Sequence, residues 1–347
     1  MATPAPSLIP LIGEAPTFLA MIEHVSRAAP LSKPVLVIGE RGTGKELIAA
    51  RLHYLSGRWE QPFIKLNCSA LTETLLESEL FGHEAGAFTG AERRRVGRFE
   101  LANDGTLFLD ELATIPQRMQ EKILRVIEYG EFERVGGSET LRVDVRIIGA
   151  TNEDLPTLAR AERFRRDLLD RLAFDVITVP PLRARREDIL MLAEHFAVNI
   201  SAELKRSYFP GFAPSAQELL LTYEWPGNVR ELKNAVERSM YRATEPDQPI
   251  ARIELDPFAS PYRVGPPSDA AVPAVGAVSA AAAKHALPMD LKKTVRALER
   301  ECLEAALAEA RYNQRAAARL LGLSYHQLRA CLRKHKLAAL RISARAG

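Results

Sequence analysis

Residues 34–46 read Pro-Val-Leu-Val-Ile-Gly-Glu-Arg-Gly-Thr-Gly-Lys-Glu, and this stretch decides the fold. It begins with a short apolar run, largely β-branched, which predicts a strand buried on both faces. After the glycine-rich turn, the apolar residues of 47–55 repeat at helical spacing. A strand, a glycine loop and a helix N-terminus in this order form a cradle of backbone N–H groups for phosphate. The sequence therefore predicts a nucleotide-binding α/β domain.

The turn contains the residues that would contact the nucleotide. Lys45 adds a positive charge that can reach the β and γ phosphates of ATP. Where the general P-loop pattern has a Ser or Thr hydroxyl for Mg²⁺, this chain has Glu46. Glycine-rich turns without a nucleotide are common, so the loop alone does not decide the function. The residues that we expect around ATP are Gly39, Glu40, Arg41, Gly42, Thr43, Gly44, Lys45 and Glu46.

A second expected strand ends in two acidic residues. Residues 105–109 are mainly apolar, and Asp110 and Glu111 follow directly. Ligands of open α/β folds collect at the carboxyl ends of the parallel strands. In a Walker B strand, the Asp holds Mg²⁺ and the Glu orients the attacking water. The alternative is a strand that ends in a solvated acidic turn, but the P-loop upstream favours ATP hydrolysis.

Between these two motifs lies an apolar loop bracketed by glycines. Glycines at both ends let a loop fold back sharply, and an apolar tip indicates a surface that contacts another molecule. The alternative is an ordinary loop with its Phe packed in the core. In its order relative to the two nucleotide motifs, the loop resembles the GAFTGA loop of the σ54-dependent transcription activators of the AAA+ class. The resemblance implies contact with σ54 through Gly86, Ala87, Phe88, Thr89, Gly90 and Ala91.

The resemblance also implies roles for residues that follow other expected strands. Asn67 would restrain Glu111 until the nucleotide state changes, although Asn at a strand end is otherwise ordinary turn chemistry. Thr151 and Asn152 would be the sensor I residues, which detect the γ-phosphate. Glu46 is the residue expected at its position in this family, so its presence puts only the route of Mg²⁺ coordination in question.

Two arginines lie off the apolar stripe of an expected helix at residues 164–172. Such arginines are usually solvated or paired with a nearby acid, here Asp167 or Asp170. In the family that this chain resembles, Arg165 and Arg171 would act as fingers that add positive charge to the active site of the neighbouring subunit. An active site completed in trans requires a closed ring. The resemblance therefore implies a homo-hexamer.

Residues 225–232 read Trp-Pro-Gly-Asn-Val-Arg-Glu-Leu. We expect a Pro-Gly turn and then a new helix with Asn228 as its N-cap. A cation in the first turn of a helix is unfavourable beside the helix dipole, so Arg230 indicates a ligand. By resemblance, Arg230 is the sensor II residue, which contacts the nucleotide from the lid.

Composition limits the alternatives. The chain has 347 residues, 47% of them hydrophobic and 26% charged, enough for two or three domains. Its three cysteines are far apart in the sequence, which argues against zinc sites and disulfides and fits a reducing cytoplasm. We find no secretory signal at the N-terminus and no apolar stretch of membrane-spanning length. We therefore expect a cytoplasmic protein without direct membrane insertion.

Four segments follow from a coarse reading of the pattern. Residues 10–180 alternate strand and helix patterns, as in an AAA+ α/β nucleotide-binding subdomain with a parallel sheet flanked by helices. Residues 181–258 are expected to form a small helical lid, and residues 259–288 a flexible linker rich in Ala, Pro, Val and Gly. Residues 259–347 contain 15 Lys or Arg against 6 Asp or Glu, which indicates a nucleic-acid partner for the C-terminal domain, residues 289–347.

The C-terminal domain shows the pattern of a helix-turn-helix. Asn313 is expected to cap a helix at residues 314–321, and Ser324 to cap a second helix that ends at His335. We expect the inner face to contain Leu320, Leu321, Leu323, Leu328 and Leu332. The alternative is a small basic helical bundle that binds a protein. The segment resembles the Fis-type domain of the same family, so the expected contacts to enhancer DNA are Ser324, Tyr325, His326, Gln327, Arg329, Arg333 and Lys334.

The resemblance covers nearly the whole chain and is nearest to the phage-shock branch of the family. Members of that branch have no receiver domain before the motor, and we expect none here, since residues 11–14 already resemble the motor's opening. The resemblance implies a PspA-like negative regulator acting in trans. Trp59, just after the first motor helix, is the candidate for this contact, although a lone Trp is more often partly buried packing.

The function expected from the sequence is an enhancer-binding ATPase that remodels the closed complex of σ54-RNA polymerase holoenzyme. A protein-remodelling AAA+ ATPase outside transcription is the main alternative, but it would have no use for a helix-turn-helix. A plain DNA-binding repressor is a second, for which the pair Asp110 and Glu111 would be superfluous.

Overall fold

The computed structural model describes residues 10–258 except 246, residues 296, 299–300, 302–307 and 310, and residues 313–335. The chain divides into two compact units, Met1–Pro266 and Pro267–Gly347. We describe each unit by itself. The expected linker at residues 259–288 lies outside the described residues.

The first unit is built on a five-stranded sheet in the order β2-β3-β6-β1-β7, and every neighbouring pair is parallel. The strands are β1 (Val35–Ile38), β2 (Phe63–Asn67), β3 (Thr106–Asp110), β6 (Arg146–Thr151) and β7 (Asp175–Thr178). The register aligns their carboxyl ends, with Asn67 opposite Asp110 and Ile38 opposite Thr151. The P-loop and the acidic pair therefore share one edge of the sheet.

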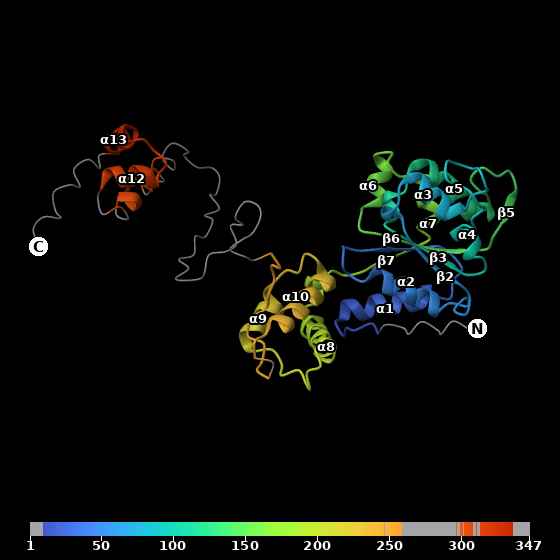
Figure 1. The fold of residues 1–347 in the computed structure, drawn as a ribbon, viewed down its shortest axis with the longest axis horizontal. Coiled ribbons are helices and arrows are strands. Elements are labelled where there is room, and N and C mark those ends of the chain that lie inside the picture. The colour runs from blue at the N-terminus through green and yellow to red at the C-terminus, as the bar shows by residue number, and fades with distance from the viewer. Residues whose placement is uncertain are drawn as a thin grey trace, which may run out of the picture. The chain divides into compact units, whose positions relative to one another are not determined.

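Both faces of the sheet are buried, as the apolar strands predict. Val35 and Val37 face one layer and Leu36 the other, because side chains alternate along a strand. The first layer contains α1 (Pro16–Ala28) and α2 (Lys45–Tyr54). The opposite layer (Figure 1) contains α3 (Glu73–Phe81), α5 (Gln117–Tyr129), α6 (Leu155–Arg160) and α7 (Arg166–Leu172). This α/β sandwich is the expected fold.

Short elements complete the sandwich. Two of them, the 3-10 turns η1 (Cys68–Ala70) and η2 (Leu112–Thr114), follow β2 and β3 at the acidic edge. The short helix α4 (Arg98–Leu101) precedes β3 and contacts α3. A two-stranded antiparallel hairpin is formed by β4 (Glu131–Glu133) and β5 (Thr140–Arg142).

The lid is a helical subdomain with its own core. It contains η3 (Leu182–Ala184), α8 (Glu187–Glu203), α9 (Pro214–Thr222) and α10 (Asn228–Arg242). The side chain of Trp225 is fully buried in this core, and its indole N–H donates to the carbonyl of Leu220 at 2.8 Å. Residues 182–184 form a 3-10 turn, and the first long helix of the lid begins at Glu187.

The second unit contains a helix-turn-helix made of α12 (Gln314–Leu320) and α13 (Tyr325–Lys334). The predicted caps are confirmed: the Asn313 side chain accepts from two backbone N–H groups, and Ser324 forms a capping box. Leu328 and Leu332 are buried as predicted, but Leu320 is 59% exposed, so its assignment to the inner face is wrong. Ala317 and Ala318 of α12 are buried instead, with Leu303 and Leu307 of the preceding helical segment.

Within the described parts of the chain, no helix is long and apolar enough to span a bilayer.

Candidate functional site

The P-loop is a tight turn that closes on its own lysine. Gly42 and Gly44 have φ of +76° and +97°, and Gly44 is the N-cap of α2. The Lys45 ammonium donates to the carbonyls of Gly39 at 2.9 Å and Glu40 at 3.2 Å. Because only 8% of Lys45 is exposed, its charge lies within the loop. The loop thus offers a helix N-terminus and one buried cation to a phosphate.

The two carboxylates of β3 act on this lysine. Burial lowers the pKa of Lys45, and the nearby charges of Glu111 and Asp110 oppose that shift. The lysine and both carboxylates therefore lie in one electrostatic site, as the sequence predicts for an ATP-hydrolysing edge.

Glu111 has a strained backbone. Its φ of +53° and ψ of +44° lie in the left-handed region, which non-glycine residues seldom adopt. Its N–H donates to the carboxylate of Asp110 at 3.0 Å, which helps hold the turn. Strain of this kind costs about 1–3 kcal/mol and clusters at functional sites.

Asn67 lies beside the acidic pair but caps a turn. Its side-chain oxygen accepts from the backbone N–H of Ser69 at 2.9 Å and from the Ser69 hydroxyl at 2.8 Å. These bonds show the turn chemistry that the sequence left open as an alternative. Next to it, burial and the charges of Asp110 and Glu111 raise the pKa of the Cys68 thiol to about 12, so Cys68 is no thiolate nucleophile.

The expected sensor I residues end the strand next to the P-loop. Thr151 is fully buried, and its carbonyl accepts the N–H of Gly39 at 3.2 Å. Its hydroxyl accepts from the N–H of Glu153 at 3.0 Å, which orders the turn containing Asn152. A displacement of the Thr151 backbone would therefore move Gly39 of the P-loop directly.

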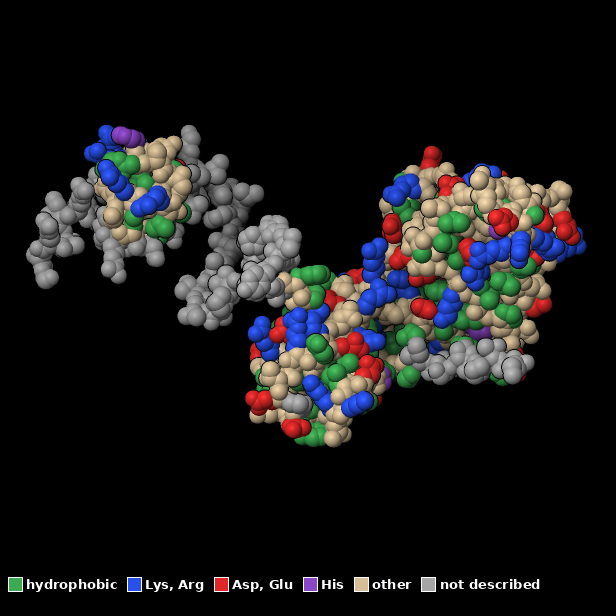
Figure 2. Space-filling model, in the orientation of Figure 1, with side chains coloured by type: hydrophobic (Ala, Val, Ile, Leu, Met, Phe, Trp, Pro, Cys, Tyr) green, Lys and Arg blue, Asp and Glu red, His purple; other side chains and the backbone are tan. Residues whose placement is uncertain are grey.

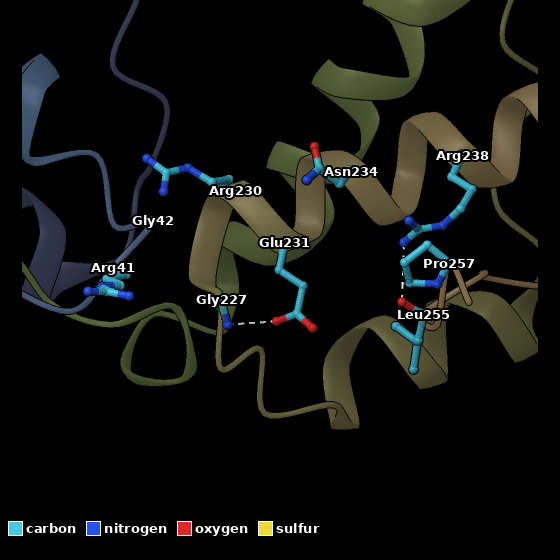
Figure 3. Close-up of a pocket in the computed structure, with 9 residues that line it drawn as sticks. All are labelled: Arg41, Gly42, Gly227, Arg230, Glu231, Asn234, Arg238, Leu255 and Pro257. Atoms are coloured by element: carbon cyan, nitrogen blue, oxygen red, sulfur yellow. Dashed lines mark hydrogen bonds between the residues drawn. The ribbon is translucent and has the colours of Figure 1, made fainter. Parts of the chain in front are cut away.

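A cavity of about 350 Å³ opens on the lid side of the P-loop (Figure 3). Arg41 and Arg230 lie at one end of it in this view, and Arg238 at the other. Arg238 donates to the carbonyls of Glu254 and Leu255 at 3.0 and 3.2 Å. The lining residues are Arg41, Gly42, Gly227, Arg230, Glu231, Asn234, Arg238, Leu255 and Pro257. The structure thus places Arg230 beside the P-loop, where the sequence expects it.

The prediction that Asn228 caps this helix is wrong. Gly227 is the N-cap, and Asn228 is the first helical residue, fully buried with φ of +52°. Its amide bonds to the P-loop and to η3 in place of the helix's own N–H groups.

The residue at the usual Mg²⁺ position is engaged elsewhere. The Glu46 carboxylate accepts from the ammonium of Lys65 on β2 at 2.9 Å, and both side chains are about half exposed. Sequence reasoning missed Lys65, because its partner is 19 positions away and belongs to another element.

Both proposed finger arginines are paired with acids. Arg165 is the N-cap of α7 and lies 2.7 Å from Asp167, one of the two partners considered from the sequence. Arg171 pairs with Glu128 of α5 at 2.8 Å, so Asp170 is not its partner. The side chain of Arg171 is 60% exposed, and that of Arg165 is 37% exposed. Both guanidinium groups are therefore open to another molecule.

The loop at residues 86–91 stands on a fixed base. His83 and Arg95 exchange backbone hydrogen bonds at 3.0 and 2.9 Å, and the N–H of Glu84 donates to Val135 at 3.0 Å. The loop then closes with the N–H of Gly86 donating to the carbonyl of Ala91 at 2.7 Å. Gly86 and Gly90 have φ of +81° and +97°, which explains the need for glycine at both positions.

The apolar side chains at the tip of the loop are only partly exposed to solvent. Phe88 is half-buried, with its ring edge-on against His83 at 5.0 Å between centroids, while Thr89 is exposed and Ala91 is buried. Phe88 thus lies between the two alternatives that the sequence left open. Its ring packs against the buried ring of His83.

A buried arginine fixes the base of the loop, and sequence reasoning missed it. Arg134 donates to Glu84 at 2.9 Å and to Glu100 at 2.9 Å, with 3% of its side chain exposed. These partners raise its pKa, with Glu100 as the main cause. Because its partners are 50 and 34 positions away, no local pattern marks it.

The second unit presents part of the expected DNA-binding surface. His326, Arg329 and Arg333 are exposed, and the visible face of this unit gathers Lys, Arg and His side chains (Figure 2). The guanidinium groups of Arg315 and Arg329 lie 5.8 and 5.9 Å from the ring centroid of Tyr325, within cation–π range.

Three of the expected DNA contacts, Ser324, Gln327 and Lys334, make side-chain bonds inside the unit. The Lys334 ammonium lies 2.7 Å from a carboxylate oxygen of Glu299. The same oxygen lies 2.7 Å from Nε2 of His335. The side-chain oxygen of Gln327 accepts the N–H of Ser324 at 2.8 Å in the capping box.

In the first unit, Trp59 is 56% exposed in the turn after α2.

Models of three known families match the chain in this order. Residues 11–178 match the Sigma-54 interaction domain, residues 183–261 the AAA+ ATPase lid domain, and residues 294–335 the bacterial regulatory protein, Fis family.

Individual proteins agree. The Psp operon transcriptional activator of Escherichia coli (strain K12) is 59% identical over 94% of this chain and 98% of its own length. The Nif-specific regulatory protein of Azotobacter vinelandii is 45% identical over 92% of this chain, which spans 57% of that longer protein. NtrX from Brucella abortus in complex with ADP matches with a TM-score of 0.67 and 32% identity, over 94% of this chain and 69% of NtrX. NtrX in complex with ATP matches with a TM-score of 0.66 over the same shares.

The three family matches thus correspond to the α/β part with its phosphate-binding edge, the lid and the helix-turn-helix. The chain belongs to the σ54-dependent transcriptional activators, AAA+ ATPases that carry a Fis-type helix-turn-helix.

Proposed function

We propose that this protein binds enhancer DNA as a hexamer and uses ATP hydrolysis to remodel closed complexes of σ54-RNA polymerase. The observation that carries the proposal is the loop at residues 86–91. Its base is fixed by Arg134, its tip leaves Thr89 exposed, and it belongs to the same unit as the strained Glu111. A loop that is fixed at its base and exposed at Thr89 and Gly90 can move as a lever.

The hydrolytic roles follow from the geometry of the sheet edge. Lys45 and the N-terminus of α2 would hold the β and γ phosphates of ATP. Glu111 would orient the attacking water, and Asn67 would restrain Glu111 until the nucleotide state changes. Thr151 and Asn152 would detect the γ-phosphate. Arg230 would contact the nucleotide from the lid.

The residues also fit Mg²⁺. Across the described residues, no group of three or more His, Cys, Asp or Glu side chains could hold a metal by itself. Mg²⁺ in phosphate-binding sites typically takes only one or two carboxylates and completes its shell with phosphates and water. Asp110 would supply that carboxylate, since Glu46 is paired with Lys65. When bound, Mg²⁺ would neutralise charge on the phosphates.

Arg165 and Arg171 would complete the site of a neighbouring subunit in a closed ring. Each is exposed and held by a carboxylate, so the phosphates of the neighbour's ATP would compete with that carboxylate for the guanidinium. Head-to-tail contacts form a ring when the rotation between subunits closes, and a hexamer is the closed ring that we propose.

The cellular role rests on the relatives. A relative that this chain matches over nearly its whole length is called a Psp operon transcriptional activator, so we propose an envelope-stress or phage-shock operon as the target. A PspA-like protein would restrain the cytoplasmic ATPase, and the exposed Trp59 is the proposed contact. A protein-remodelling ATPase outside transcription remains the second candidate. The helix-turn-helix disfavours it.

Glu111→Gln should lower kcat for ATP by 10²-fold or more while ADP affinity changes little, because an amide keeps the shape but cannot polarise water. Steady-state hydrolysis and equilibrium ADP binding on the same preparation measure the two quantities. Near-normal turnover would assign the water-orienting role to another residue.

Thr89→Ala should hydrolyse ATP at about the normal rate and yet fail to melt a σ54 promoter, because the loop tip contacts the partner and not the phosphates. Permanganate footprinting of the promoter measures melting, and ATP turnover by the same preparation is the control. Full promoter melting would reduce the loop to ordinary structure.

Lys45→Ala and Arg165→Ala should each be nearly inactive, but a mixture should regain some ATP turnover. Some interfaces in a mixed ring will pair an intact P-loop with an intact finger. The test is hydrolysis across a range of mixing ratios, with mixed assembly verified by mass spectrometry. No recovery at any ratio would argue against a shared site.

Arg329→Ala and Arg333→Ala should each weaken DNA binding and reduce the salt slope by about 1, because each loses a phosphate contact. Lys334→Ala is the matched comparison and should change the slope less, since Glu299 already neutralises its ammonium. Fluorescence anisotropy with DNA from upstream of the target promoter, across a range of KCl, measures the slopes. Equal slope changes for Arg333 and Lys334 would contradict this division.

A further inference from the structure

The P-loop is fastened to the lid by side chains that the hydrolytic chemistry does not use. We propose that Glu40, Arg183 and Asn228 form a latch that holds the lid on the P-loop and must open for nucleotide exchange. In this latch, Asn228 is a positioning residue for Arg230, and Glu40 is an anchor for the lid and not a phosphate ligand. The proposal rests on the assignment of an ATPase site to this P-loop.

Asn228 uses its whole amide in the latch. Its oxygen accepts the N–H of Leu182 at 2.8 Å, and its nitrogen donates to the Glu40 carboxylate and to the Arg41 carbonyl, both at 3.0 Å. The residue is fully buried and its backbone is left-handed, with φ of +52°. Asn tolerates this conformation better than most residues. A buried polar group needs such partners, since leaving it unpaired costs stability.

Glu40 supplies the charge of the latch. Its carboxylate accepts from the Arg183 guanidinium at 2.8 Å, and a second hydrogen bond joins the same two groups. The bonds from Arg183 first and from Asn228 second lower the pKa of Glu40 to about 2. Glu40 is therefore ionised and engaged at neutral pH. An anionic side chain beside the phosphates would repel them, so pairing with Arg183 also shields the nucleotide site from this charge.

The backbones of the lid and the P-loop touch at the same place. A Cβ atom added to Gly42 would lie 2.3 Å from the carbonyl oxygen of Gly227 and 3.0 Å from Cβ of Arg230. The N–H of Arg230 donates to the carbonyl of Gly42 at 3.3 Å. The bond between Gly227 and Glu231 holds this helix start in shape (Figure 3). Asn228, two residues earlier, thus sets where the Arg230 side chain begins.

The lid has a second fastening that differs in kind. Asp188 of α8 is fully buried and accepts the N–H groups of Glu14 at 2.7 Å and Ala15 at 2.9 Å. The Glu40 and Arg183 side chains, by contrast, are 42% and 40% exposed. Water can replace the exposed pair more easily than the buried one. We therefore assign the opening movement to the Glu40 and Arg183 pair of the latch and the pivot to Asp188.

The test is the dissociation rate of a fluorescent ADP analogue from the full chain, measured by stopped-flow displacement. Glu40→Gln keeps an acceptor for Asn228 but loses the charge, and Arg183→Gln removes the other partner. Each should speed ADP release by about tenfold and raise KM for ATP, and Arg183→Gln should change kcat by less than about threefold. The double variant should be no faster than either single variant, because residues in one contact are not additive.

Arg186→Gln is the matched control. Arg186 lies in the same lid and pairs with Glu224 at 3.4 Å, and both side chains are exposed. ADP release from this variant should match the wild type. Asn228→Ala should release ADP faster still. Asn228→Asp should also release ADP faster than the wild type, because a carboxylate cannot donate a hydrogen bond to Glu40.

The outcomes separate the latch from the ATPase assignment. A wild-type chain that binds and hydrolyses ATP, with Glu40→Gln and Arg183→Gln releasing ADP like Arg186→Gln, would overturn the latch alone. Additive effects in the double variant would overturn it too, since the two side chains would then act separately. A wild-type chain that binds neither ADP nor ATP would overturn both the latch and the nucleotide site.

Discussion

The structure depends on the parallel alignment of the strands β2, β3, β6 and β1. Hydrogen bonding in register places Asn67 opposite Asp110 and Ile38 opposite Thr151, so that the ends of four strands meet at one edge. Burial of both faces keeps that register, because a slip of one residue would turn apolar side chains to the wrong layer. The P-loop, the acidic pair and the sensor positions are thus brought together by backbone pairing.

Two departures from relaxed geometry mark this edge. Glu111 has a left-handed backbone at the end of β3, and Asn228 has one at the start of α10. Each costs about 1–3 kcal/mol and persists only where neighbouring bonds hold it. Here the Asp110 carboxylate holds the first, and Leu182, Glu40 and Arg41 hold the second. The strained residues lie where hydrolysis and lid movement would act, and Arg134 fixes the loop that would transmit the result.

The sequence was sufficient wherever the signal was local. Apolar periodicity predicted the strands, the glycine pattern predicted the P-loop, and the caps at Asn313 and Ser324 were correct because a cap bonds to residues two or three positions away. Long-range partners were not predictable. Asn228 bonds to Glu40, 188 positions away, and so does not cap its own helix. Lys334 is neutralised by Glu299, 35 positions away. Leu320 faces solvent, because alanines of α12 take the buried positions in the core of this unit.

The central claim is that ATP hydrolysis at this edge drives σ54-dependent promoter melting. Open-complex formation by σ54-RNA polymerase holoenzyme on a matched promoter, with ATP compared against a non-hydrolysable analogue, tests it most directly. We predict heparin-resistant open complexes only with this protein, ATP and σ54 together, and none with the analogue. An equal yield of open complexes with the analogue would contradict the account. So would open complexes that this protein induces with a holoenzyme containing a different σ factor on that factor's own promoter.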